Sequence, residues 1–163
     1  MEMSPLRDCL VMKLTRYSDY ALRVSLYLAL HRDRLVSIQE VVKTYALPRG
    51  NVMKLVTDLV GAGILVSVRG RAGGIRLAQS PQDITVGRVV RHTEGNTPLV
   101  DCSSCILAPA CGLICIMREA QQAFFGVLDS YSLQDVITKN PDILTFLNRD
   151  IVDVSARPGT VDR

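Results

Sequence analysis

The pattern of apolar and polar positions predicts three helices in the first part of the chain. From residue 14 to residue 31, apolar side chains recur every three or four positions, as in an amphipathic helix. Ser37 and Glu40 have the spacing of a capping box, in which each side chain accepts from the other residue's amide, so a second helix is expected from Ser37. A third should begin at Pro48, whose missing N–H is harmless in a first turn, and end at Gly61-Ala62-Gly63.

Two short strand-like runs, at residues 64–68 and 75–78, follow the third helix. The segment between them, Arg69-Gly70-Arg71-Ala72-Gly73-Gly74, is rich in glycine and allows a tight reversal with two arginines at its tip. A β-hairpin directly after a helix-turn-helix is a wing. The first half of the chain is thus predicted to be a winged helix-turn-helix module, which is a DNA-binding architecture.

Helical periodicity returns in the second half. Residues 85–93 are expected to form a fourth helix, residues 94–110 an irregular segment, and residues from about Cys111 onward a long helix. Ser132 is placed to cap a last helix at 133–137. A helix of about twenty residues cannot bury its whole apolar stripe against a small winged-helix domain, so its expected partner is the same helix of a second subunit.

Composition and charge narrow the possible classes of protein. Hydrophobic residues make up 48% and charged residues 21% of the chain, as in folded proteins. No segment approaches the ~20 uncharged apolar residues of a membrane span, and no secretory signal is visible, so we expect a cytoplasmic protein without membrane contact. The first 78 residues hold about twice as many Lys and Arg as Asp and Glu residues. That excess suits a nucleic-acid contact, although ordinary surface charge can produce it too.

Four cysteines, Cys102, Cys105, Cys111 and Cys115, lie within fourteen residues. The fifth, Cys9, stands apart, and the odd total fits poorly with a secreted disulfide framework. Thiolates are soft ligands for iron–sulfur clusters, zinc or Cu(I). The C-x2-C and C-x3-C spacings also approach those of structural zinc sites, so the residues alone leave zinc and an iron–sulfur cluster close to even. Small buried cysteines are the weaker interpretation.

Several polar side chains are placed to contact DNA. Those on the first turns of the third helix can reach base edges or phosphates in a major groove, although each could be ordinary surface. The candidates there are Pro48, Arg49, Gly50, Asn51 and Lys54. Arg69 and Arg71 at the wing tip suit the negative potential of a narrow minor groove. Since no catalytic motif is present, an enzyme is not expected.

Four stretches of the chain match one known pattern. They are MKLTRYSDYALR at 12–23, ALPRGNVMKL at 46–55, VRGRAGGIRL at 68–77, and the triplet Cys102, Cys105 and Cys111. Together they resemble the winged-helix transcriptional regulators that carry iron–sulfur clusters, the family of NsrR and IscR. The resemblance covers roughly residues 12–138 and is greatest to the nitric-oxide-sensing repressors of the NsrR type.

The resemblance implies an iron–sulfur-dependent repressor that senses nitric oxide, iron or redox state. Cys102, Cys105 and Cys111 would be cluster ligands, with Asp19 of the opposite subunit as the fourth, as in some NsrR proteins. The chain departs from the family in the short gap between the first two cysteines and in the extra thiol of Cys115. A helix beginning at Cys111 would put Cys115 on the same face, making Cys115 the alternative fourth ligand. Both [2Fe–2S] and [4Fe–4S] clusters suit such a ligand set.

The whole sequence therefore predicts a mainly α fold with a small β-hairpin wing and a long dimerisation helix. Its expected parts are an N-terminal extension at 1–11, a winged helix-turn-helix region at 12–93, a cysteine-rich cluster-binding loop at 94–111, a dimerisation helix and C-terminal helix at 112–138, and a partly disordered tail at 139–163. A homodimer would recognise a pseudo-palindromic operator in double-stranded DNA. The alternatives are a zinc-stabilised winged-helix regulator with a different signal and a metal-free winged-helix interaction module.

Overall fold

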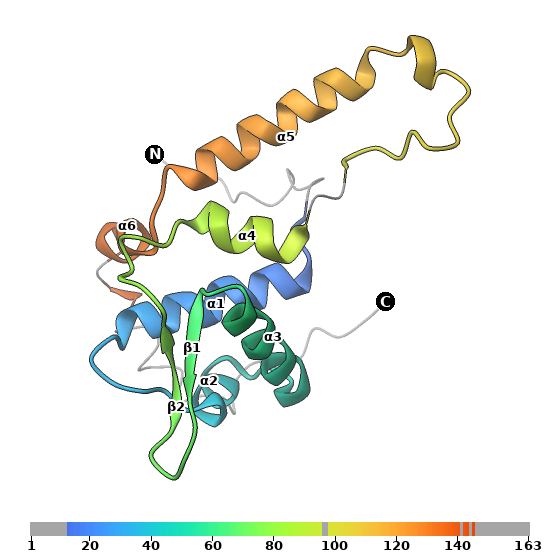
Figure 1. Cartoon of the computed structure of the whole chain (residues 1–163). Coiled ribbons are helices and arrows are strands. Elements are labelled where there is room, and N and C mark those ends of the chain that lie inside the picture. Colours follow the sequence, from blue (N-terminus) through green and yellow to red (C-terminus); the bar gives the residue numbers. More distant parts are fainter. Residues whose placement is uncertain (1–12, 96–97, 141, 144, 146–163) are drawn as a thin grey trace, which may run out of the picture.

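The computed structural model describes residues 13–95, 98–140, 142–143 and 145. The expected N-terminal extension and most of the expected tail lie outside the described residues. Six α-helices, one short 3-10 helix and a two-stranded antiparallel sheet make up the described part (Figure 1), which confirms the mainly α fold with a hairpin wing. None of the helices described there is long and apolar enough to cross a membrane.

The first three helices begin within two residues of the positions that the sequence predicts. They are α1 (Arg16–Leu30), α2 (Ile38–Tyr45) and α3 (Arg49–Gly61). The Thr15 side chain caps α1 by accepting from the Ser18 amide, and Pro48 stands directly before α3. Ala46 takes a left-handed backbone conformation (φ 50°) that ends α2 and turns the chain into α3. The predicted helix-turn-helix is therefore present.

Only half of the predicted capping box forms at α2. The Ser37 side chain accepts from the Glu40 amide at 3.1 Å, as expected. The Glu40 carboxylate, however, accepts from the Tyr27 hydroxyl at 2.7 Å and from the Arg34 guanidinium at 3.0 Å. A charge-assisted bond to arginine is stronger than a bond to a neutral amide, and the bond from Arg34 chiefly lowers the pKa of Glu40. Glu40 thus joins α2 to α1 and to the turn between them instead of capping its own helix.

The wing is a regular hairpin of β1 (Leu65–Val68) and β2 (Gly74–Leu77), paired so that Leu65 lies opposite Leu77. On its other side, β2 forms an isolated antiparallel bridge between Ile75 and Val36. The turn requires glycine at two positions. Gly70 has a φ of 119°, and a Cβ atom at Gly73 would lie 2.9 Å from the Gly70 carbonyl oxygen.

The core lies between α1, α3 and the inner face of the wing. Its fully buried aliphatic side chains include Val24, Leu28, Val52, Leu55, Leu59, Ile64, Leu65 and Ile75. Each such side chain contributes roughly 1.5–3 kcal/mol relative to exposure, so together they hold the hydrophobic stripe of α3 firmly inward. The opposite side of α3 is consequently turned to solvent.

The second half of the chain adds α4 (Val86–Glu94), a 3-10 helix η1 (Ala108–Ala110), α5 (Leu113–Asp129) and α6 (Leu133–Lys139). Helix α4 packs on α1, and α5 packs on α4. The N-terminal end of α5, next to η1, extends beyond the other helices (Figure 1). Ser132 caps α6 with a complete capping box, as its position predicts.

The long helix, predicted from about Cys111, begins two residues later at Leu113, and this small difference decides how Cys111 is placed. Cys111 has an extended backbone (φ −90°, ψ 117°), and Gly112 is the residue that precedes the first turn of α5. The cause is local, because the preceding three residues form the separate turn η1 and Gly112 has little helix propensity. Cys111 and Cys115 therefore do not share a helical face, and the geometric reason for pairing them is lost.

The junction of α4 and α5 is held by one close approach and one charged pair. Arg91 forms an ion pair with Asp129 and lies over the Phe125 ring, 4.2 Å from its centre. Phe125 is only 7% exposed. Gly87 lies directly beneath Asp129, since a Cβ atom at Gly87 would be 2.8 Å from the Asp129 amide nitrogen.

Gly87→Ala is therefore expected to destabilise the protein by about 1–3 kcal/mol, because the added methyl group forces α4 and α5 apart. Gly126→Ala on α5 is the matched control, since nothing lies within 4 Å of its Cβ position and alanine favours a helix. Urea unfolding of both variants measures the difference. Equal free energies of unfolding would show that this junction does not resist a larger side chain.

Candidate nucleic-acid interface and metal centre

The first turns of α3 present their polar side to solvent. Arg49, Gly50, Asn51 and Lys54 are exposed, as is Pro48 before them. No ion pair within the described chain involves either cation. The residues of this helix that the sequence proposes as DNA contacts therefore lie on its solvent side, and the charges of Arg49 and Lys54 are available. Sequence reasoning missed one neighbour, Met53, which is 47% exposed on the same helix and is a chemical match for a thymine methyl group.

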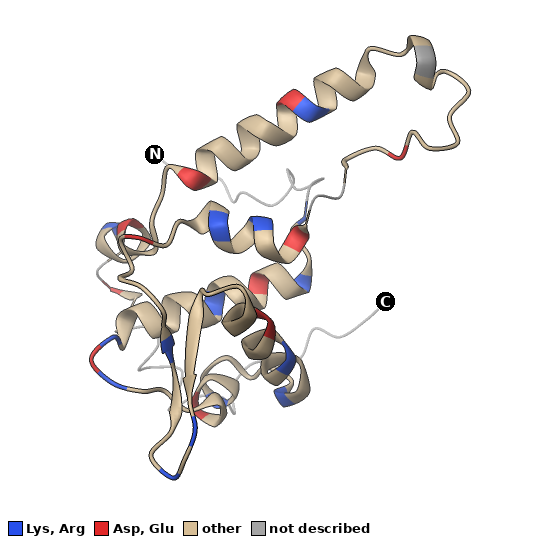
Figure 2. Ribbon diagram, in the orientation of Figure 1, with Lys and Arg blue, Asp and Glu red and all other residues tan. Residues whose placement is uncertain are grey.

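The hairpin tip supplies a second set of available charges. Arg69 and Arg71 are exposed, and among the described residues neither pairs with a carboxylate. Figure 2 shows Lys and Arg at the tip of the wing and on α3, whereas acidic residues are absent from the drawn hairpin itself. A recognition helix with a basic wing beside it suits a major groove and the adjoining backbone or minor groove.

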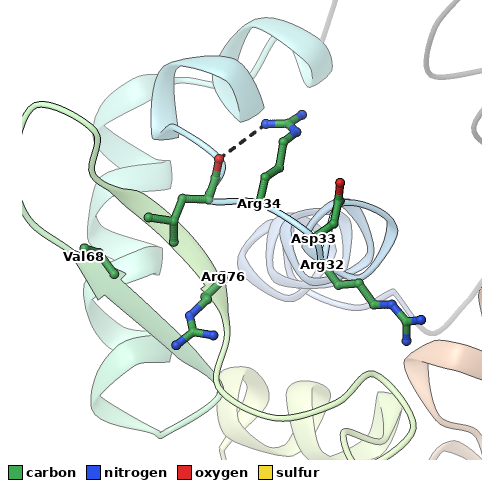
Figure 3. A pocket seen from close by; sticks show the side chains of 6 residues that line it. Arg32, Asp33, Arg34, Val68 and Arg76 are labelled. Carbon is green, nitrogen blue, oxygen red and sulfur yellow. Dashed lines mark hydrogen bonds between the residues drawn. The ribbon is translucent and has the colours of Figure 1, made fainter.

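A shallow hollow of about 310 Å³ beside the wing extends this basic surface (Figure 3). Its lining residues are Arg32, Asp33, Arg34, Leu35, Val68 and Arg76. Arg34 is engaged by Glu40, whereas Arg32 and Arg76 form no ion pair within the described part of the chain. Arg32 and Arg76 add positive charge to the side of the wing, and the negative charge of Asp33 partly offsets it. Sequence reasoning missed Arg32 and Arg76 because they line the same hollow only in the folded chain.

The four clustered cysteines are free thiols: Cys102, Cys105 and Cys111 lie on the segment that leads into α5, and Cys115 lies in the first turn of α5. The Cys105 amide donates to the Cys102 carbonyl at 3.3 Å, so these two residues bracket a single turn. Cys102 and Cys111 are half-buried, and Cys105 and Cys115 are exposed. Asp101 accepts from the Ser103 amide at 3.0 Å, and the bonds from Ser103 lower the pKa of that carboxyl. The thiols are thus accessible at the surface.

Neither candidate fourth ligand lies with the other cysteines. Asp19, in the first turn of α1, forms an ion pair with Arg23 at 2.8 Å. The cysteine segment extends away from α1 in Figure 1. Cys115 lies in the first turn of α5, separated from Cys111 by the break described above. Across the described residues, no three His, Cys, Asp or Glu side chains are grouped closely enough to hold a metal ion.

The donor chemistry of this segment nevertheless fits a thiolate-bound metal group. Several soft ligands lie within one irregular stretch, and none of the four is consumed in a disulfide. The stretch packs little of its own apolar surface, because Ile106 is 93% and Leu107 is 65% exposed. Few native contacts would have to break for such a segment to close around a metal.

The start of α1 is tied to the end of α4 by Glu94. Its carboxylate accepts from the Thr15 amide at 2.8 Å and from the Thr15 hydroxyl at 3.0 Å, and also from the buried Ser18 hydroxyl. Burial opposes ionisation of Glu94, but the bonds from Ser18 and Thr15 outweigh it and lower the pKa of the carboxyl. Thr93 adds a bond to Ser18 at 2.7 Å. The segment carrying Asp19 is therefore bonded to the end of α4, after which the chain runs on to the cysteine segment.

A second polar contact joins α1 and α4 to α3. Asp58 accepts from the Tyr17 hydroxyl at 2.9 Å, and His92 Nε2 lies 3.0 Å from the same carboxylate oxygen. Burial, together with the hydrogen bond to Asp58, raises the pKa of Tyr17 to about 12. His92 therefore has a defined polar partner in the fold. No local pattern in the sequence predicts these contacts.

Helix α5 leaves most of its apolar side chains uncovered. Among the described residues of α5, only Phe125 is buried, at its junction with α4. Leu113, Ile116 and Val127 are 44%, 61% and 60% exposed. A helix with so much exposed aliphatic surface is typical of an element that packs against another chain.

The winged-helix fold with its basic recognition helix and wing defines a DNA-binding transcriptional regulator. The chain belongs to the Rrf2 family, described as iron-dependent transcriptional regulators, whose family model matches residues 14–139. It is 40% identical over 142 residues to the HTH-type transcriptional regulator NsrR of Bacillus subtilis (strain 168), spanning 83% of this chain and 97% of that protein. It is 41% identical over 143 residues to NsrR of Bacillus licheniformis, spanning 84% and 100%. The predicted family and the predicted lack of enzyme activity are thereby confirmed.

Solved structures agree with this assignment. The chain is similar to T. potens IscR, with a TM-score of 0.65 and 26% identity over 79% of this chain and 88% of that one. It is also similar to CymR, the global cysteine regulator of B. subtilis, with a TM-score of 0.61 and 28% identity over 78% of this chain and 98% of that one. The winged-helix architecture is thus common to this chain and these regulators.

Proposed function

We propose that this protein is a repressor whose binding to promoter DNA depends on an iron–sulfur cluster and responds to nitric oxide, iron supply or redox state. The observation that carries the proposal is the group of free, accessible thiols on one segment joined directly to the DNA-binding module. The curated relatives named NsrR, at about 40% identity over most of both chains, support it.

Cys102, Cys105 and Cys111 would hold the cluster, with either Asp19 of a second subunit or Cys115 as the fourth ligand. When bound, the cluster supplies a redox-active and nitric-oxide-reactive centre. The chain's own residues do the rest. The thiolates fix the position of the segment between α4 and α5. Because Glu94 at the end of α4 is bonded to Thr15, a shift of that segment also shifts the start of α1. A coupling of ~1–3 kcal/mol changes operator affinity roughly 5–150-fold, so a small rearrangement is enough.

The functional unit is proposed to be a homodimer joined through α5. Its exposed Leu113, Ile116 and Val127 would pack against the same helix of the second copy. A two-fold dimer presents two copies of α3 to successive major grooves, about 34 Å apart, and therefore recognises a pseudo-palindromic operator. In each half-site Arg49, Asn51 and Lys54 face the major groove.

Purification under anaerobic conditions tests the proposal most directly. A brown protein with visible absorbance, iron and sulfide, whose affinity for promoter DNA changes after exposure to nitric oxide, is the expected result. Colourless protein with stoichiometric zinc would replace the proposal with a zinc-stabilised regulator. Protein without any metal, and with DNA binding unaffected by nitric oxide, would leave a metal-free winged-helix module.

A further inference from the structure

One carboxylate oxygen connects three helices at the rear of the recognition helix. Asp58 Oδ2, near the end of α3, is 2.9 Å from the Tyr17 hydroxyl of α1 and 3.0 Å from His92 Nε2 of α4. Tyr17 is 41 positions and His92 is 34 positions from Asp58 in the chain, so the contact exists only in the folded protein. The side chains are only partly exposed, at 31% for His92 and 41% for Asp58.

Both partners of Asp58 lie beside the residues proposed to respond to the cluster. Tyr17 is two positions before Asp19 in α1. His92 is two positions before Glu94, after which the chain runs on to the cysteine segment. Because Glu94 binds the start of α1, a displacement of the cysteine segment would move Tyr17 and His92 together.

The buried side chains of α3 in the described structure hold it in a less directional way. They are the buried aliphatic residues Val52, Leu55, Val56 and Leu59. Hydrophobic contact is non-directional, so these residues hold α3 against the core but tolerate a small rotation or slide along it. A hydrogen bond weakens steeply when its geometry changes, so Asp58 is sensitive to the positions of its two partners.

We propose that Asp58 is the positioning residue through which the cluster segment sets the orientation of the recognition helix. The inference rests on the proposed function and identifies the path of its regulation. Displacement of α1 and α4 breaks or strengthens the bonds from Tyr17 and His92. The end of α3 follows, and Arg49 and Lys54 on its first turns change their alignment with DNA.

The measured quantity is the ratio of operator dissociation constants for the cluster-loaded and cluster-free full-length protein. Asp58→Ala removes the shared acceptor and is expected to reduce a ratio of roughly 5–150 to less than about threefold. Asp58→Asn keeps one acceptor oxygen and should restore part of the ratio. Tyr17→Phe removes one donor and should lower the ratio. Tyr20→Phe on the same helix is the matched control. It also removes a hydroxyl, but the Tyr20 hydroxyl forms no hydrogen bond within the described structure.

Three outcomes are distinguishable when cluster absorbance and thermal stability are followed alongside. A reduced ratio with undiminished absorbance supports the proposal. An unchanged ratio in Asp58→Ala overturns it, even if both dissociation constants rise by the same factor, because that result describes a purely structural role. A wild-type ratio of one means that the cluster does not control DNA binding, and the proposed function then fails together with this inference.

Discussion

Replacing Cys105 with alanine is expected to abolish stable cluster binding and, with it, regulated binding to DNA. Cys105 is an exposed thiol that brackets a turn with Cys102, and alanine offers no donor atom in its place. Loss of even an outer-shell partner of a metal ligand costs roughly 10–100-fold in metal affinity, so loss of a direct ligand should cost at least about 100-fold. Visible absorbance and iron content after anaerobic reconstitution measure the effect.

Ser104→Ala is the control for this substitution. Ser104 is the exposed neighbour of Cys105, so the change removes a hydroxyl from the same segment without touching a thiol. Its iron content should match that of the parent. If Cys105→Ala retained a full complement of iron, Cys105 would not be a ligand, and the triplet on which the proposed site rests would have to be abandoned.

The identity of the fourth ligand follows from a parallel comparison of Asp19→Ala and Cys115→Ala. The Asp19–Arg23 pair is an exposed i,i+4 pair, which contributes only about 0.3–0.5 kcal/mol to stability, so its loss leaves the fold intact. The extended backbone at Cys111 removes the shared helical face that favoured Cys115. Asp19→Ala is therefore expected to accelerate cluster loss more than Cys115→Ala does. The reverse order would assign the ligand to Cys115.

Local sequence signals were enough to predict most of the fold. Ser37 and Ser132 mark helix starts because their side chains satisfy amide groups a few residues away. The glycines at 70 and 73 mark the hairpin because other residues are disfavoured in its turn. The periodic apolar positions of α1 and α3 coincide with the buried core. Each of these signals acts within a few residues and can be read without knowing the rest of the structure.

The features that sequence reasoning missed depend on contacts between distant residues. Glu40 has the spacing of a capping box, yet Tyr27 and Arg34 claim its carboxylate once the helices pack. Asp58 and His92 are unremarkable alone and become a junction only when α3 and α4 meet. The ligand set has the same difficulty, because Asp19 and the cysteines are distant along the chain and not grouped within the described residues. Under the proposed function, their assembly would require the metal group and, for Asp19, a second copy of the chain.

Arg69→Ala at the wing tip is expected to weaken operator binding by about 1–3 kcal/mol, which corresponds to roughly 5- to 150-fold, while cluster content stays unchanged. The reason is that Arg69 is exposed and, in the described part of the chain, has no carboxylate partner, so its charge is fully available to DNA. Titrations of operator DNA at several salt concentrations show whether Arg69 contacts a phosphate or a base. A phosphate contact lowers the salt slope by about one, whereas a base contact changes sequence preference instead.

The double variant Arg69→Ala/Arg71→Ala extends the test to the whole tip, where the slope should fall by about two if both side chains bind phosphates. Arg118→Ala, an exposed arginine on α5 far along the chain from the wing, is the matched control and should leave both affinity and slope unchanged. Both wing arginines are exposed, so their replacement should leave thermal stability unchanged. Wild-type affinity in the double variant would exclude the wing from the interface and leave DNA recognition to α3 alone. A parallel loss of cluster content would instead reveal a folding defect, because the wing and the cysteine segment lie at opposite ends of the described structure (Figure 1).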